Sequence, residues 1–208
     1  MKTIDLTLPL THKMPVYPGD PAVSIKQTYT VDADHIQLHT LMLSTHSGTH
    51  MDAPAHILSN GRTLDTYPPE QFMGSALVIS SPTASINLVT LQNHTDEIAK
   101  AEVLLFHTGH IAKWGKPEYF STPTGLTPAG AEFLAQFQLK AVGGDFPSID
   151  STDSLQAHKT LLQNDILIYE SLTNLHQLPA KGATFVGLPL PIQGSDGAPV
   201  RAIAYYQP

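Results

Sequence analysis

Hydrophobic residues along this chain fall in short stretches that alternate with turns rich in proline and glycine. Apolar and polar positions alternate over Thr3–Leu8, which is typical of a strand with one buried face. The stretches Val23–Val31 and Ile36–Ser44 also have the composition of strands. Further short apolar runs predict the remaining strands: Ser75–Ser80, Val103–Phe106, Leu139–Gly143, Ile166–Tyr169 and Val200–Tyr205.

Helical spacing appears in two segments between these strands. Residues Pro128–Phe137 form one helix, with Thr127 as its N-cap and proline at the first helical position. Either Asp153 or Ser154 is placed to cap a second helix that extends to Leu162. The mixture predicts an α/β fold with a β-rich centre. No linker, repeat or low-complexity run divides the chain, so we expect residues 1–208 to form one domain.

A dense cluster of metal-ligand residue types follows the third predicted strand. His46, His50, Asp52 and His56 lie within eleven residues of one another. Imidazole and carboxylate groups together are the ligand set of Zn²⁺, Mn²⁺ and non-haem Fe²⁺. Histidine is common in this chain, with 11 in 208 residues, so a histidine-rich loop is the alternative interpretation. The identity of the residues favours a metal site.

The backbone must bend for these residues to share an ion. In an extended strand, His46 and His50 would lie ~13 Å apart, too far for one metal. Gly48 and Pro54 are the residues that permit and fix a bend. We therefore expect a strand that ends near Thr45, followed by an irregular ligand loop.

A metal held by one loop would be weakly fixed, so ligands are also expected from distant parts of the chain. His158 lies among leucines on the second predicted helix, a pattern that equally fits a half-buried helix histidine. Glu170 directly follows a buried strand, where a carboxylate is costly without a counter-charge; a solvent-facing strand end is its alternative interpretation. The other candidates are His94, His107, His110, His176 and the acids, of which Asp145, Asp150 and Asp153 are expected in turns and caps.

His56 is the last residue of the cluster, and a further ligand there would overcrowd the site. A free imidazole beside metal-bound water would act as a general base and acid. Because a metal lowers the pKa of bound water toward ~7, this arrangement suits hydrolysis of an amide or ester by metal-bound hydroxide. Two other functions stay open. His50, Asp52 and His158 fit the 2-His-1-carboxylate site of a non-haem Fe²⁺ oxygenase, and a non-catalytic metal-stabilised module would use the same ligands.

Composition limits the partners and the compartment. The formal net charge is −7, and the 11 lysines and arginines are scattered, so nucleic acid and membrane are not expected partners. There is no cysteine, which excludes disulfides and thiolate ligands. The N-terminal segment has no long apolar core, and no run reaches the ~20 residues of a membrane span, so we expect a cytoplasmic protein. The low charge suggests that some neutral surface is buried in an oligomer.

The motif H-x-G-T-H-x-D-x-P-x-H at residues 46–56 resembles that of the cyclase-like metal-dependent hydrolases, a family that includes arylformamidases (kynurenine formamidases) and isatin hydrolases. The resemblance continues along nearly the whole chain, through these segments: Asp5–Leu10, Tyr17–Pro21, Gly125–Pro128, Gly144–Asp150, Glu170–Leu175 and Asp196–Ala202.

The resemblance implies a swivelling β/β/α domain with a central sheet or barrel, assembled as a homodimer or homotetramer. It implies two zinc ions per chain, with manganese as the alternative, and small amide, formamide or cyclic amide and ester substrates. His56 would be the catalytic acid and base, and Asp52 would bridge the ions. Two positions that line the pocket in the family differ here, because Tyr17 replaces a tryptophan and His107 replaces an arginine. The implied metal ligands are His46, His50, Asp52, His158 and Glu170.

Overall fold

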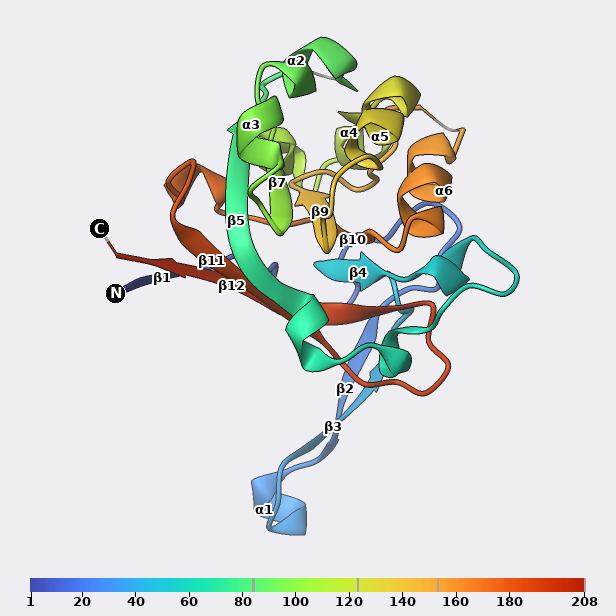
Figure 1. The fold of residues 1–208 in the computed structure, drawn as a ribbon. Coiled ribbons are helices and arrows are strands. Elements are labelled where there is room, and N and C mark those ends of the chain that lie inside the picture. Colours follow the sequence, from blue (N-terminus) through green and yellow to red (C-terminus); the bar gives the residue numbers. More distant parts are fainter. Residues whose placement is uncertain (84, 123, 153, 208) are drawn as a thin grey trace.

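Most strands of the chain belong to one sheet (Figure 1). The computed structural model describes residues 1–83, 85–122, 124–152 and 154–207. The strands of this sheet are β1 (Lys2–Asp5), β4 (His50–Asp52), β5 (Met73–Ser80), β7 (Val103–His107), β9 (Ala141–Gly144), β10 (Leu167–Glu170), β11 (Ala183–Pro189) and β12 (Gly197–Tyr206). Their order is β1-β12-β11-β5-β7-β9-β10-β4.

The short strand β4 closes this sheet into a barrel. It pairs antiparallel with β10 on one side and with the first residues of β12 on the other. Within the described residues, seven strands therefore form a closed ring, and β1 pairs with β12 beyond it. Strands β5, β7, β9 and β10 run parallel to one another. Strand β11 is antiparallel to both of its neighbours, β5 and β12. The predicted α/β fold with a β-rich centre is confirmed.

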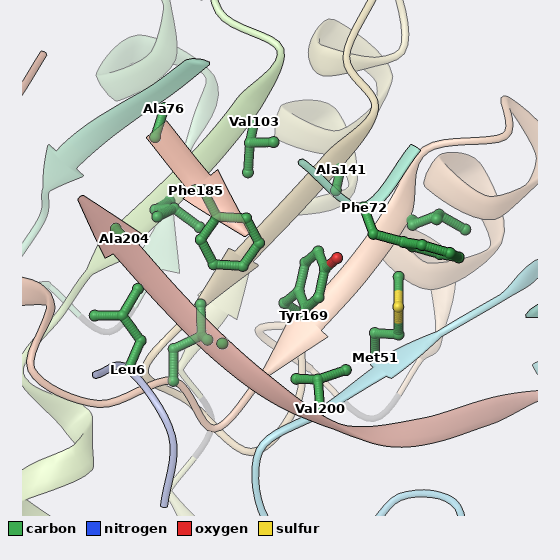
Figure 2. Close-up of a cluster of buried hydrophobic side chains, with 14 of the residues drawn as sticks. Leu6, Met51, Phe72, Ala76, Val103, Ala141, Tyr169, Phe185, Val200 and Ala204 are labelled. Carbon is green, nitrogen blue, oxygen red and sulfur yellow. The ribbon is translucent and has the colours of Figure 1, made fainter. Parts of the chain in front are cut away.

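Side chains on the inner face of the sheet form the first of two hydrophobic cores. Figure 2 shows Met51, Tyr169, Phe185 and Val200 gathered there, from four different strands. The Tyr169 hydroxyl donates to the carbonyl oxygen of Gly187 at 2.7 Å, so this buried polar atom is satisfied. The core joins the parallel strands to β4 and β12, and so holds β4 in place.

The second core lies between the outer face of the parallel strands and the helices above them (Figure 1). Alternate residues of these strands face it, such as Leu77, Leu104 and Ile168, so both faces of the sheet are buried. This explains why the strands read as continuous apolar runs. The helices on this side are α2 (Leu88–Gln92), α3 (Thr95–Ile98), α4 (Glu118–Ser121), α5 (Pro128–Leu134) and α6 (Gln156–Gln163).

The two predicted helices are present, but only one begins as expected. Thr127 caps α5 by accepting a hydrogen bond from the Gly130 amide. Helix α6 has Leu155 at its N-cap position, with a φ of 53° and no side-chain cap of its own. The prediction that Ser154 caps α6 is wrong, and Asp153 lies outside the described residues. The carboxylate of Asp150, from the preceding loop, accepts the first amide hydrogens of α6 instead.

A hairpin formed by β2 (Ser24–Tyr29) and β3 (Leu38–Met42) projects from the body of the molecule, with α1 (Val31–Asp34) at its tip (Figure 1). Both strands were predicted, but the hairpin pairs only with itself, and every residue of β3 is exposed. No helix in the described ranges is long and apolar enough to span a membrane. The remaining elements are short: β6 (Ser85–Ile86), β8 (Gly125–Leu126), and the 3₁₀ turns η1 (Pro54–His56), η2 (Leu64–Thr66), η3 (Pro69–Phe72), η4 (His110–Lys113) and η5 (Leu175–Gln177).

Candidate metal centre

Four of the predicted ligands meet where β4, β10 and α6 come together. His50 and Asp52 lie on β4, and Glu170 is the last residue of β10. The register of the two strands places Glu170 directly opposite His50. His158 is buried on α6, above this strand pair. All four side chains are at most 6 % exposed, so the sheet and the helix hold them away from bulk water.

The bend required by the sequence occurs at Gly48. Its φ is +65°, and a Cβ atom there would lie 3.0 Å from Cε of Met14, so both the conformation and the space favour glycine. After the bend the chain forms β4, not a continuous irregular loop, because β4 finds a partner on each edge. That part of the prediction is wrong. Pro54 then begins η1, which returns His56 to His46, with ring centroids 4.1 Å apart.

The donor atoms form two groups that share Asp52. In the first, Oδ1 of Asp52 lies 2.8 Å from Nδ1 of His46 and 3.4 Å from Nε2 of His50. In the second, Oδ2 of Asp52 lies 3.5 Å from Nε2 of His158, which is 3.3 Å from Oε1 of Glu170. Within each group the ligand atoms are all less than 4.8 Å apart. The geometry thus offers one oxygen of Asp52 to each group.

Asp52 is the residue whose surroundings most clearly fit bound cations. Its side chain is 1 % exposed, and Oδ2 has no hydrogen-bond partner within the described residues. The Nε2 atom of His158 is 3.5 Å from this oxygen, which is too long for a good hydrogen bond. Leaving a buried carboxylate oxygen unpaired is costly, and a metal ion would remove that cost. No lysine or arginine of the described chain pairs with Asp52 or Glu170.

The electrostatics of the cluster show strong mutual stabilisation of opposite charges. Burial opposes ionisation of Asp52, but hydrogen bonds from the surrounding histidines hold its pKa well below the usual value. Burial likewise disfavours charged His46, yet the carboxylates of Asp52 and Asp196 raise its pKa to about 9. The pKa of His158 is also raised, since its bonds to carboxylates outweigh burial. The same carboxylates that favour positive charge on these rings would favour a bound metal cation between the same donors, with the imidazoles then neutral.

Hydrogen bonds behind the cluster orient its ligands. The Nδ1 atom of His158 donates to Asp150, and that of His50 donates to the Gly48 carbonyl oxygen at 2.9 Å. The Nε2 atom of each ring therefore faces the carboxylates of Asp52 and Glu170. The amide of Ile149 donates to Glu170 at 2.7 Å and fixes the second carboxylate. Such outer contacts are typical of metal-binding histidines. Asp150 was expected only in a turn or a cap, and no feature of the sequence indicated its contact with His158.

His56 stands at the edge of the cluster with its side chain 31 % exposed. Its Nδ1 atom lies 3.4 Å from Oδ2 of Asp196, and the same oxygen is 2.8 Å from Nε2 of His46. These three residues form a further group of donors with the spacing of a metal site. Sequence reasoning missed Asp196 as a site residue. Its signals in the sequence were the turn at Ser195–Gly197, where β12 begins, and its place at the start of the segment Asp196–Ala202 that resembles the family.

A cavity of about 240 Å³ opens over these donors. Its apolar wall is formed by Val16, Tyr17, Trp114, Phe120 and Leu155. Tyr17 packs edge-on against Phe120, with ring centroids 5.9 Å apart. The cavity is therefore lined both by the metal-ligand candidates and by aromatic rings, which suits a small molecule with an apolar part and a polar reactive group.

The remaining candidates lie elsewhere. Contrary to expectation, His107 is not part of the cavity wall. It ends β7, where its ring faces Ser80 and His176, because the chain turns away at Thr108 and Gly109, whose amides donate to Asp145. His110 is buried and bonded to the Tyr119 carbonyl oxygen. Asp145 thus has the turn-stabilising role that was expected.

Comparison with known proteins gives consistent matches along the chain. The putative cyclase family matches residues 4–151. A kynurenine formamidase from Salinibacter ruber is 34% identical over 98% of this chain and 97% of its own length. Among solved structures, an isatin hydrolase bound to the product analogue thioisatinate has a TM-score of 0.88 at 24% identity, covering 99% of this chain and 93% of its own. A potential metal-dependent hydrolase with cyclase activity has a TM-score of 0.83 at 26% identity, covering 100% and 98%.

Proposed function

The chain belongs to the cyclase family, and from this premise we propose that it is a metal-dependent hydrolase that cleaves the C–N bond of small amides, formamides and cyclic amides, or the C–O bond of related cyclic esters. The observation that carries the proposal is the pair of donor groups that share Asp52 beneath an aromatic-walled cavity. Both the metal dependence and the kind of bond are those named for the relatives.

We propose that the two groups hold two ions per chain, most simply zinc, with manganese as the alternative. His46, His50 and Asp52 would bind one ion, and Asp52, His158 and Glu170 would bind the other. Nitrogen and oxygen ligands of this kind suit both metals. When bound, the ions would polarise a carbonyl oxygen and lower the pKa of a water molecule.

The residues of the chain supply the remaining requirements for hydrolysis. His56 lines the cavity beside the donor groups without belonging to the pair that shares Asp52, so its imidazole is available to move a proton to the leaving nitrogen. Tyr17, Trp114 and Phe120 give the cavity an aromatic wall that favours an aryl group. Aromatic formamides and anilides with a planar ring are therefore the substrate class that we propose.

The two other functions considered from the sequence have less support. A mononuclear iron oxygenase needs two histidines and one carboxylate around its metal, but here a second buried carboxylate, Glu170, completes a second donor group. A purely structural metal site is closed by protein ligands, whereas these donors face an open cavity that His56 also lines.

Assembly is a separate proposal, supported by the projecting hairpin. A two-stranded ribbon is only marginally stable alone in water, yet this one carries Val31, Leu41 and Met42, each more than half exposed. We propose that a second copy of the chain covers it in a homodimer or a homotetramer. We further propose that residues 1–208 form one domain, because β1 pairs with β12 from the other end of the chain. Its location in the cytoplasm stays a prediction.

The test of the hydrolase is a substrate panel with controlled metal content. Protein stripped with a chelator and reloaded with zinc or manganese is incubated with an aryl formamide, isatin and an activated ester. We expect turnover that requires added metal, and elemental analysis showing two ions per chain. Saturation at one ion per chain would contradict the binuclear site. Loaded protein that cleaves none of these compounds would contradict the hydrolase.

A further inference from the structure

Asp196 occupies an unusual place between two functional histidines. It lies in the turn before β12, and its Oδ2 atom is 2.8 Å from Nε2 of His46 and 3.4 Å from Nδ1 of His56. The hydroxyl of Thr45 donates to its other oxygen at 3.1 Å, and the Ala53 amide donates to its carbonyl oxygen at 2.8 Å. The residue is thus held on both its side chain and its backbone by the segment that carries the histidine motif.

The turn is fitted closely around the ring of His46. A Cβ atom at Gly197 would lie 2.7 Å from Cε1 of that ring and 2.8 Å from the Met51 carbonyl oxygen. Only glycine allows this approach without a shift of the ring or of the strand. The position of Asp196 is therefore built into the site, and the contact is not a chance meeting of two surface side chains, although Asp196 is 39% exposed.

The chemistry of a carboxylate fixes the direction of both hydrogen bonds. An ionised carboxylate only accepts, so Nε2 of His46 and Nδ1 of His56 must both carry a proton toward Asp196. Asp196 is partly exposed and lies within hydrogen-bond distance of the Thr45 hydroxyl and of both imidazole rings, the surroundings of an ionised, accepting carboxylate. In neutral His56, the proton on Nδ1 leaves Nε2 as the free, basic nitrogen.

We propose that Asp196 is a positioning residue that sets the tautomer and the ring orientation of His56, with its shorter bond to His46 as the anchor. The inference rests on the proposed function, in which His56 moves the proton. The same carboxylate would hold the proton-transferring ring at a constant distance from a metal ligand. Carboxylates that hold a neighbouring imidazole in one tautomer are a general device of acid–base sites.

The first test reads the tautomer directly and needs no substrate. Zinc-loaded protein with ¹⁵N-labelled histidine is studied by NMR well above the ordinary histidine pKa, with His56→Ala used to assign the His56 signals. We expect His56 to carry its proton on Nδ1 in the native protein, and to shift toward the Nε2–H form in Asp196→Ala. Asp5→Ala is the matched control, since Asp5 is a similarly exposed carboxylate with a side-chain partner, Arg201, away from the cavity. An unchanged tautomer in Asp196→Ala would overturn the proposal.

The second test asks whether Asp196 acts through His56. We expect Asp196→Asn to lower kcat about 10–100-fold with little change in KM and with metal retained, the range seen when outer partners of site residues are lost. In the His56→Ala background the same substitution should cause no further loss. If the losses in kcat from the two substitutions multiply, or if metal is lost in proportion to activity, the effect would pass through His46 and contradict the proposal. So would a third ion per chain that disappears in Asp196→Ala.

The two proposals fail in different ways. If no compound is hydrolysed but the His56 tautomer depends on Asp196, the assignment of Asp196 holds and the hydrolase is wrong. If hydrolysis occurs, but substitution of Asp196 changes neither the His56 tautomer nor kcat, the hydrolase proposal holds and the role proposed for Asp196 is wrong.

Discussion

The two ends of the parallel strands use the same kinds of side chain for opposite purposes. At the amino ends, Glu102 accepts hydrogen bonds from the amide and the hydroxyl of Ser75 and pairs with Lys140 at 2.9 Å. The Lys140 ammonium also donates to the carbonyl oxygens of Glu70 and Met73, each at 3.0 Å. Both charges lie near the surface and are fully partnered. The charged groups at this end therefore find their partners within the folded chain and need no added ligand.

At the carboxyl end of β10, charges are buried and incompletely partnered. Asp52 and Glu170 are at most 5 % exposed and face histidines, not lysine or arginine. One oxygen of Asp52 has no hydrogen bond in the described residues. Since a buried carboxylate oxygen without a hydrogen bond costs stability, its presence beneath a cavity indicates a site for cations rather than a structural device. The comparison shows that pairing, and not residue type, separates a functional cluster from a stabilising one.

The largest expected effect comes from making the same change at both ends. Asp52→Asn should remove most of the metal and all hydrolysis, because an amide cannot supply the charge with which a bridging carboxylate holds two cations. Glu102→Gln, the matched change at the other end, should keep both. Elemental analysis and turnover on an aryl formamide measure the two variants. Unchanged metal content in Asp52→Asn would show that Asp52 is not a ligand.

His56→Ala should separate metal binding from proton transfer within the cluster. We expect this variant to keep its metal and to lose ~10²–10⁴-fold in rate, the usual contribution of a general acid or base. The loss should be larger for amides than for activated esters, because an amide nitrogen leaves only when it is protonated. Metal stoichiometry is measured beside turnover on both kinds of substrate. If metal disappears together with activity, His56 is a ligand and the division of roles is wrong.

Asp150→Asn should have a smaller effect that passes through His158. The change weakens the bond that orients this ring, and we expect about 10–100-fold weaker metal binding or activity. Asp150 also caps α6, so stability must be measured separately. Thr127→Ala is the control: it removes the cap of α5 at a cost of about 1 kcal/mol and should leave metal affinity unchanged. Equal metal affinities in both variants would contradict an orienting role of Asp150.

Local features of this molecule could be predicted from the sequence, and contacts between distant segments could not. The short apolar runs, the Thr127 cap and the bend at Gly48 depend on neighbouring residues, so their signals are local. The spacing of His46, His50 and Asp52 was informative for the same reason. The family resemblance, rather than periodicity, selected His158 and Glu170, and the structure brings both to Asp52.

Topology decides the parts that were missed. Asp196 reaches His46 across 150 residues only because β12 pairs with β4. Asp150 replaces a local cap on α6 because the loop after β9 passes over its first turn. His107 was expected in the cavity because the family has a pocket-lining residue at this position. In this structure the ring of His107 faces His176 instead, because the chain turns after β7. Side-chain direction at a strand end depends on the following turn, which periodicity does not report.

The smallest expected effect concerns Glu102, at the amino ends of the parallel strands, and its contribution to stability depends on pH. The Lys140 partner and the Ser75 amide lower the pKa of Glu102 from 4.5 to about 2. A carboxyl group with a depressed folded-state pKa contributes stability above its unfolded-state pKa, and that contribution is lost as the pH falls through the folded-state value. The contribution of Glu102 is therefore present above about pH 4.5 and declines between that pH and about pH 2.

Because the side chain of Glu102 is 45 % exposed, solvent screening limits this contribution to about 1 kcal/mol or less. We expect Glu102→Gln to lower the free energy of unfolding by that amount at neutral pH, and to converge with the native protein as the pH falls from about 4.5 toward about 2. Urea unfolding of chelator-treated protein isolates the effect from metal binding. Glu132→Gln, at an exposed position on α5, should follow the native protein throughout. A difference that persists unchanged at acid pH would mean that Glu102 stabilises the sheet by packing and not by charge.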